Sequence, residues 1–202
     1  MTGIIGAGAA VVLLLWPRQV SDDLVSYPFT TAGFYVAQVV FFVHHLGLLV
    51  LVVAFARSAA FGEGRVARGG AWLAVAGTAA LAAAELLAMR YATWDFTTAN
   101  EGLMGAAYGI ACNAVGLGML AAGVGTLRRR VWSGWFKWTP LAVGVTQFVV
   151  LTPGMFGGFV VARLAIGTWM LTFAALGWGL YADARGTAPA RSQTRQHAAA
   201  AR

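Results

Sequence analysis

The stretch "TAGFYVAQVVFFVHHLGLLVLVVAF", residues 31–55, contains no Asp, Glu, Lys or Arg. About 20 predominantly apolar residues are enough for an α-helix to cross the hydrocarbon layer of a bilayer. This stretch is longer than that, so it predicts a transmembrane helix. The rest of the chain is interpreted around it.

The composition of the whole chain indicates an integral membrane protein. Of its 202 residues, 59% are hydrophobic and only 10% are charged, and the mean hydropathy is +0.72. A soluble domain carries about 25% charged residues, so this chain has too few to cover a globule with polar surface. The net charge of +7 does not indicate a nucleic-acid partner, because the basic residues lie in short segments between apolar stretches, as membrane topology requires.

Apolar stretches of suitable length recur along the chain and predict an all-α, polytopic transmembrane helical bundle of about six spans. We expect them at 3–16, 31–55, 70–88, 103–127, 138–152 and 158–181. Residues 1–184 then form one domain in the cell membrane. The Ala-, Arg- and Gln-rich residues 185–202 have no apolar periodicity and are expected to be a disordered cytoplasmic tail.

The distribution of basic residues predicts the orientation of these spans. Eleven of the 14 Lys and Arg residues fall on one side, which the positive-inside rule makes cytoplasmic, so both termini are expected there. They are Arg57, Arg65, Arg68, Arg128, Arg129, Arg130, Lys137, Arg185, Arg191, Arg195 and Arg202. The outer loops instead carry most of the carboxylates.

Two charged residues lie inside the predicted apolar layer. Glu85 is in the stretch "AALAAAELLAMRYATWDFTTANEGL", residues 79–103, and Arg163 is in the last span. At 1.5 Å of rise per residue, both lie roughly 5–8 Å below the outer boundary. An unpaired charge at this depth is costly, so we expect the two side chains to form an ion pair.

Other polar and aromatic residues fall in the same half of the predicted bundle and indicate a cavity open to the outer side. The expected lining residues are Gln38, Phe41, Phe42, His45, Tyr108, Asn113, Gln147, Arg163 and Trp169. Asp95, Asn100 and Glu101 are expected at its rim. The alternative is structural: a simple ion pair, with amides that join helices by hydrogen bonds.

The sequence predicts no metal, haem, disulfide, nucleotide-binding or hydrolase site. His44 and His45 are adjacent, so they point about 100° apart and do not bind one metal ion or haem from the same helix face. The single cysteine, Cys112, excludes an intramolecular disulfide. The sequence has no nucleotide-binding or hydrolase motif, and it predicts no metal or cofactor.

Two resemblances add expectations to this interpretation. The segment "WSGWFKWTPLAVGVTQFVVLTP", residues 132–153, resembles a stretch of small actinobacterial polytopic membrane proteins of unassigned function. Glu85 and the following "RYATWDF" resemble the acid region of the membrane-bound terpene cyclases of indole and meroterpenoid pathways. That resemblance implies acid-initiated cyclisation of an isoprenoid, with Glu85 as the acid, Asp95 or Glu101 assisting, and aromatic faces stabilising carbocations.

Three functions therefore stay open on the sequence alone. The first is a membrane-embedded enzyme, of isomerase or lyase type, that acts on a lipophilic substrate with membrane lipid around it. The second is a small transporter or channel. The third is a lipid-binding accessory protein whose buried polar residues are structural. A Glu85–Arg163 pair would favour the binding of an anionic headgroup or diphosphate over proton donation, because a nearby cation favours the ionised carboxylate.

Overall fold

The computed structural model describes residues 1–58, 60–62, 64–129 and 132–185. Its secondary structure is helical, apart from one isolated bridge between Leu24 and Asp95. The α-helices are α1 (Thr2–Leu15), α2 (Thr31–Arg57), α3 (Arg65–Ala88), α4 (Phe96–Glu101), α5 (Leu103–Arg129), α6 (Thr139–Thr146), α7 (Thr152–Gly154) and α8 (Gly158–Ala184). The predicted tail lies outside the described residues, except for Arg185.

Four of the expected spans are long and apolar enough to cross a membrane. They are α2, α3 together with the 3-10 turn η1 (Met89–Tyr91) that follows it, α5 and α8, each 27 residues long. At 1.5 Å per residue such a helix is about 40 Å long, which exceeds the roughly 30 Å of the hydrocarbon layer. The chain therefore has the features of a membrane protein.

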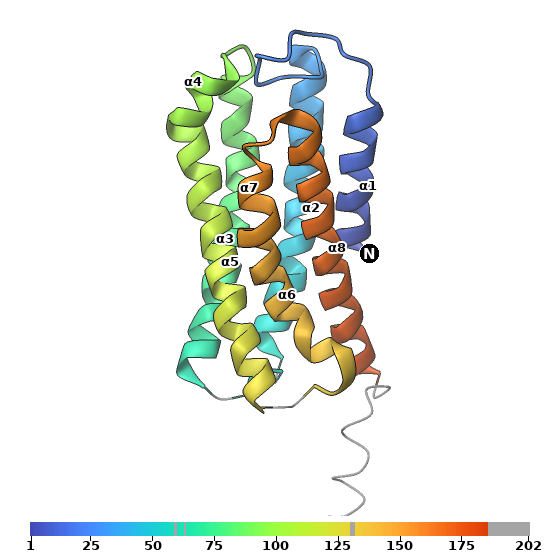
Figure 1. Cartoon of the computed structure of the whole chain (residues 1–202), viewed down its shortest axis with the longest axis vertical. Helices are drawn as coiled ribbons and strands as arrows, with labels where there is room; N and C mark the ends of the chain where they lie inside the picture. Colours follow the sequence, from blue (N-terminus) through green and yellow to red (C-terminus); the bar gives the residue numbers. More distant parts are fainter. Residues whose placement is uncertain (59, 63, 130–131, 186–202) are drawn as a thin grey trace, which may run out of the picture.

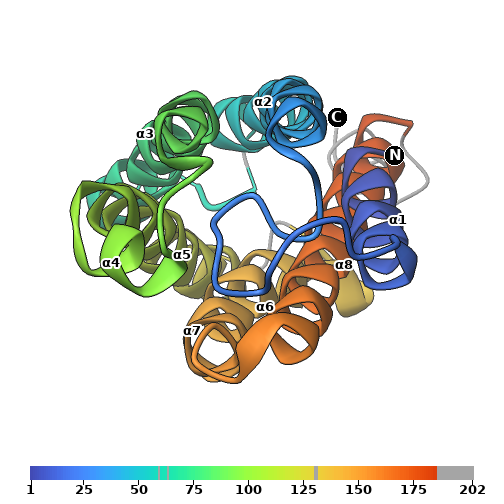
Figure 2. The ribbon, with the colours of Figure 1, turned by 90° about the horizontal axis from the view of Figure 1, so that it is seen from above.

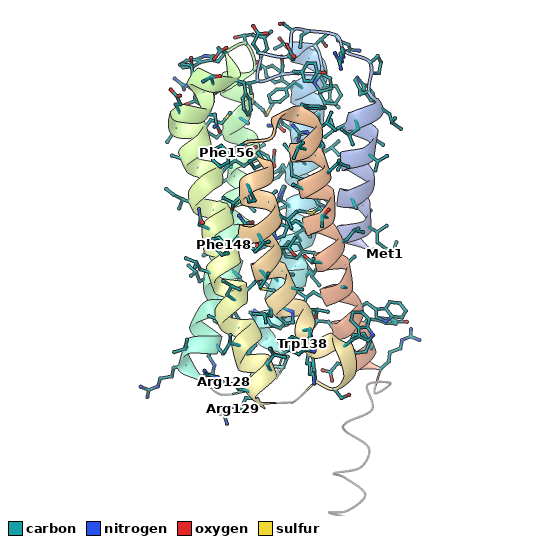
Figure 3. The ribbon with its side chains drawn as sticks, viewed as in Figure 1. Met1, Arg128, Arg129, Trp138, Phe148 and Phe156 are labelled. Carbon is teal, nitrogen blue, oxygen red and sulfur yellow. The ribbon has the colours of Figure 1, made fainter. Side chains whose placement is uncertain are left out.

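The first and fifth expected spans also form helices, but shorter ones. The 14-residue α1 begins about halfway along the bundle, where Met1 is labelled, and runs to the end that carries α4 (Figures 1 and 3). The fifth span is a composite of α6, the π-helical turn η3 (Gln147–Leu151) and α7. Neither reaches the length of the other four, so six complete crossings are not established.

The helices form a ring when the bundle is seen along its length (Figure 2). The segment between α1 and α2 crosses the top of this ring. It is attached to the turn after α3: Val25 N donates to Trp94 O at 3.0 Å, and Ser26 N donates to Ala92 O at 3.2 Å. This segment and α4 close one end of the bundle.

Close contact between α3 and α5 depends on glycine. A Cβ atom at Gly77 would lie 2.7 Å from Val115 N and 2.8 Å from Ala111 O, both on α5. Small residues allow such approaches, which drive helix association in lipid. A Cβ atom at Gly109, also on α5, would instead have no neighbour within 4 Å, because Gly109 faces a cavity.

The two ends of the bundle differ in packing. The largest fully buried side chains include Phe55, Met119, Phe173 and Leu176, which belong to the end where α5 terminates at Arg128 and Arg129 (Figure 3). The outward faces remain apolar and exposed. On α2 they carry Val36, Val39, Val40, Val43 and Val50. The half toward α4 contains a cavity with polar residues in its wall, beside a smaller buried apolar cluster that includes Phe34, Tyr91 and Met104.

Candidate functional site

A cavity of about 470 Å³ lies inside the ring of helices. This volume is in the range of small-molecule sites. Residues from α1, α2, α3, α4, α5, η3, α7 and α8 line it, and most of the lining side chains are apolar or aromatic. Within it, the charged side chains are Glu85 and Arg163.

Glu85 points inward because of its position on α3. Leu81, Ala82, Ala84 and Ala88, three or four residues away or adjacent, are buried with it, as expected for one face of a helix. The Glu85 residue is 7% exposed. Its carboxyl group is therefore removed from water and lies on the cavity wall.

Two side chains contact the Glu85 carboxyl group. The Tyr108 hydroxyl on α5 donates to Oε2 at 2.8 Å, and His45 Nδ1 on α2 lies 3.4 Å from Oε1. The same Nδ1 lies 2.9 Å from the backbone oxygen of Phe41. A carbonyl oxygen only accepts, so Nδ1 carries the proton and Nε2 of a neutral His45 is an acceptor.

The expected ion pair between Glu85 and Arg163 is not formed in the described part of the chain, because Tyr108 and His45 occupy the carboxyl group. Arg163 instead stacks on Phe159, one helical turn away on α8, with 4.8 Å between the guanidinium carbon and the ring centroid. Its Nε is buried and has no hydrogen-bond partner among the described residues.

Gln147, like Arg163, is a buried polar residue with an atom that forms no hydrogen bond among the described residues. It is 2% exposed, at the start of the π-helical turn η3. The Thr152 hydroxyl donates to Gln147 O at 2.9 Å, and Gln147 Nε2 points to that hydroxyl oxygen at 3.4 Å. Its Oε1 has no partner in the described residues. π-helical turns of this kind are frequent at functional sites.

Most of the other predicted lining residues are present, with differing roles. Gln38 is buried in the wall beside Tyr108. Asn113 Nδ2 donates to Gly109 O at 2.8 Å, and Trp169 Nε1 donates to Val143 O at 3.0 Å, so these two polar groups are already engaged within the bundle. Phe41 lines the cavity.

Three predicted site residues lie outside the lining. These are Phe42, Asp95 and Glu101. Asp95 caps α4: its Oδ1 accepts from Thr98 N at 3.0 Å. Glu101 is exposed at the end of α4. Their neighbours Phe96 and Asn100 contribute to the cavity instead, because α4 turns its other side to the bundle.

The sequence did not indicate the contribution of α1. Gly6, Ala10 and Leu13 line the cavity, and His44 Nε2 lies 3.0 Å from Thr2 O, which ties α2 to the beginning of α1. A side chain at Gly6 would collide with His44 and Met170. Cys112 and several methionines also line the cavity. Glycine-rich α1 has no polar residue in its lining face from which its place could be predicted.

The described residues contain no group of three or more His, Cys, Asp or Glu side chains that could hold a metal ion. Comparisons with known proteins add no assignment: no protein-family model, curated protein or solved structure matches the chain.

Proposed function

We propose that the protein is a membrane-embedded enzyme that takes a lipophilic, isoprenoid-type molecule into its cavity and protonates a carbon–carbon double bond from Glu85. The observation that carries this proposal is the Glu85 carboxyl group, held by Tyr108 and His45 on the wall of a largely apolar cavity. A low-dielectric wall favours a neutral carboxylic acid, which is the form that can donate a proton.

The proposed reaction is an isomerisation or cyclisation in which atoms and charge balance. The Glu85 O–H bond breaks, a C–H bond forms from the olefin π electrons, and a carbocation results. Aromatic faces in the lining, such as those of Phe41 and Trp169, stabilise such cations. A C–H bond of the cation then loses its proton to the Glu85 carboxylate, which restores the acid, while Tyr108 and His45 keep their contacts with the carboxyl group.

Packing favours this proposal over a channel. A channel needs a polar path to the other end of the bundle, and that end is filled by Phe55, Phe173 and Leu176, each at most 1% exposed. The cavity therefore has an apolar floor, which suits a lipophilic molecule that enters and leaves from the same half.

The orientation belongs to the same proposal. The arginine-rich end of the bundle, with the C-terminal end of α8, lies in the cytoplasm, and the end closed by α4 faces outward. The composite fifth helix makes a fifth pass in the cell membrane, whereas the 14-residue α1 begins about halfway along the bundle and extends only to its outer end (Figure 1). Substrate then reaches the cavity from the outer half of the bilayer.

Deuterium labelling tests the proton transfer. The full-length protein in lipid nanodiscs is incubated in D₂O with farnesol and with geranylgeraniol, and products are analysed by mass spectrometry. We expect an isomeric product with one carbon-bound deuterium. Replacing Glu85 by Gln should lower its formation by about a hundredfold or more, the usual contribution of a general acid.

Glu101→Gln is the matched control, because it removes a carboxylate outside the cavity and should leave labelling unchanged. Absence of labelled product from the wild-type protein, or equal labelling by a folded Glu85→Gln protein, contradicts the proposal. If Glu85→Gln changes only the stability, the accessory interpretation replaces it.

A further inference from the structure

Arg163 is the charged cavity residue that the proposed reaction does not use. A guanidinium group stays protonated in proteins. With Gly158 at the start of α8, five residues of helical rise place Arg163 about 8 Å below that end of the helix. A charge at such depth is costly unless it is paired, and by default it marks a functional site.

The contacts of Arg163 within the protein satisfy it only in part. Stacking on Phe159 stabilises the positive charge through the ring face, but a ring face does not replace the hydrogen-bond acceptors that a guanidinium group needs. The buried Nε has none among the described residues. The Nε–H group of Arg163 therefore lacks an acceptor within the described part of the chain.

The charges of the cavity-lining residues also indicate that an anionic group binds there. Its charged lining residues are Glu85 and Arg163. The proposed function, on which this step rests, requires Glu85 to be neutral before it donates its proton. The positive charge of Arg163 is then unbalanced in the cavity, and an anionic group of the bound molecule would balance it.

Gln147 adds a second requirement for the bound group, which is a hydrogen-bond donor. The single Thr152 hydroxyl proton is used on Gln147 O, so Thr152 Oγ1 receives an N–H from the Gln147 amide. This fixes the amide orientation and leaves Oε1 as a buried acceptor without a donor among the described residues. A group that satisfies both residues must accept from Arg163 and donate to Gln147.

The two residues lie at nearly the same height. Trp169 Nε1 bonds to Val143 O, which places these two positions side by side. Arg163 is six residues from Trp169 and Gln147 is four residues from Val143, in both cases toward the outer end. At 1.5 Å per residue, their heights differ by about 3 Å, and both line the same cavity.

We infer that the cavity binds a lipid with a phosphate monoester headgroup, with the phosphate oxygens at Arg163, a P–OH group at Gln147, and the apolar chain toward Glu85. A monoester monoanion has both the acceptors and the hydroxyl donor that the two side chains require, whereas a carboxylate or a phosphate diester has no hydroxyl to donate. Arginine is well suited to phosphate because its N–H groups match the spacing of the oxygens.

The test measures binding of three ligands with the same chain: farnesyl phosphate, farnesol and farnesylamine. The full-length protein is held in a nonionic detergent micelle, and dissociation constants are measured by native mass spectrometry. We expect farnesyl phosphate to bind at least about tenfold more tightly than the other two, a difference of about 1.4 kcal/mol. Arg163→Gln should remove this preference.

Arg90→Gln is the matched control, since Arg90 lies outside the cavity and should not affect the preference. A second pair of ligands keeps the test independent of Arg163→Gln folding. Farnesyl methyl phosphate keeps the charge but lacks the P–OH, so it should bind more weakly than farnesyl phosphate, and Gln147→Leu should abolish that difference. Equal affinities of the three farnesyl compounds for the wild-type protein would overturn the inference.

The affinity for inorganic phosphate distinguishes a lipid headgroup from free phosphate as the ligand. If it binds as tightly as farnesyl phosphate, the site takes free phosphate and the lipid assignment is overturned. Failure of the proposed function is distinguishable: a phosphate preference without Glu85-dependent deuterium incorporation leaves a lipid phosphate-binding protein. Deuterium incorporation into farnesol without any phosphate preference removes only the present inference.

Discussion

At the scale of single residues, the hydrogen bond from Tyr108 to Glu85 reports on the charge of the carboxyl group. The 2.8 Å bond would be retained if Glu85 were replaced by Gln, whose amide oxygen also accepts. Bonds to a neutral acceptor contribute about 1 kcal/mol, whereas bonds to an ionised group contribute about 1.5–3 kcal/mol. A neutral Glu85 and a Gln at this position should therefore be equivalent partners.

We predict that Tyr108→Phe lowers the free energy of unfolding by about 1 kcal/mol, and by the same amount within about 0.5 kcal/mol in a Glu85→Gln background. Reversible unfolding in mixed micelles measures both values. Tyr35→Phe, on the exposed face of α2, serves as the control and should change little. A cost that is more than about 1 kcal/mol larger in the wild-type background would show an ionised Glu85 and argue against its role as an acid.

Residue depth could be predicted from the sequence, but residue partners could not. Counting residues along each span placed Gln38, Tyr108 and Gln147 in the same half as Glu85, and the structure places all four on one cavity. Depth says nothing of the direction in which a side chain points around its helix. For that reason the sequence joined Glu85 to Arg163, at similar depth, where the structure brings Tyr108 and His45 to it.

At the scale of helices, the glycines of α3 differ in whether they lie against a neighbouring helix. A Cβ atom at Gly77 would meet the backbone of α5 at 2.7 Å, and backbone atoms cannot move aside as a flexible side chain does. Gly69, on the same helix, has nothing within 4 Å of that position. The two positions thus form a matched pair.

We predict that Gly77→Ala destabilises the protein by about 1–3 kcal/mol, the usual range for overpacking. Gly69→Ala should be neutral or stabilising by up to about 1 kcal/mol, because Ala is the better helix former. Chemical denaturation in micelles measures both. Equal effects of the two substitutions would contradict the close approach of α3 and α5.

The composite fifth helix shows where element prediction from the sequence ends. Apolar length predicted a span near residues 138–152, and a helical segment is found there, but its π-helical turn at Gln147–Leu151 was not predicted. The turn is accompanied by the hydrogen bond from the Thr152 hydroxyl to Gln147 O, and no hydrophobic periodicity marks such a local change. The position of α1 could not be predicted from the sequence either, because small apolar residues make its contacts.

At the scale of the whole molecule, the bundle is divided into a packed half and a half that contains the cavity. The packed half carries Arg128 and Arg129, and the half with the cavity is covered by α4 and by the segment between α1 and α2 (Figure 1). Basic residues remain on the cytoplasmic side of membrane proteins. The cavity should then face the outer leaflet, and the two ends differ in access to reagents added outside the cell.

Cysteine labelling tests this orientation. In a Cys112→Ala background, which removes the single native cysteine, Thr97→Cys places a thiol on exposed α4 and Arg128→Cys places one at the exposed end of α5. We predict that a membrane-impermeant maleimide labels Thr97→Cys in intact cells and labels Arg128→Cys only after permeabilisation. The Cys112→Ala protein without an added cysteine is the control and should remain unlabelled. The reverse pattern would place the covered end of the cavity in the cytoplasm, and labelling of both positions in intact cells would contradict a bundle that separates two compartments.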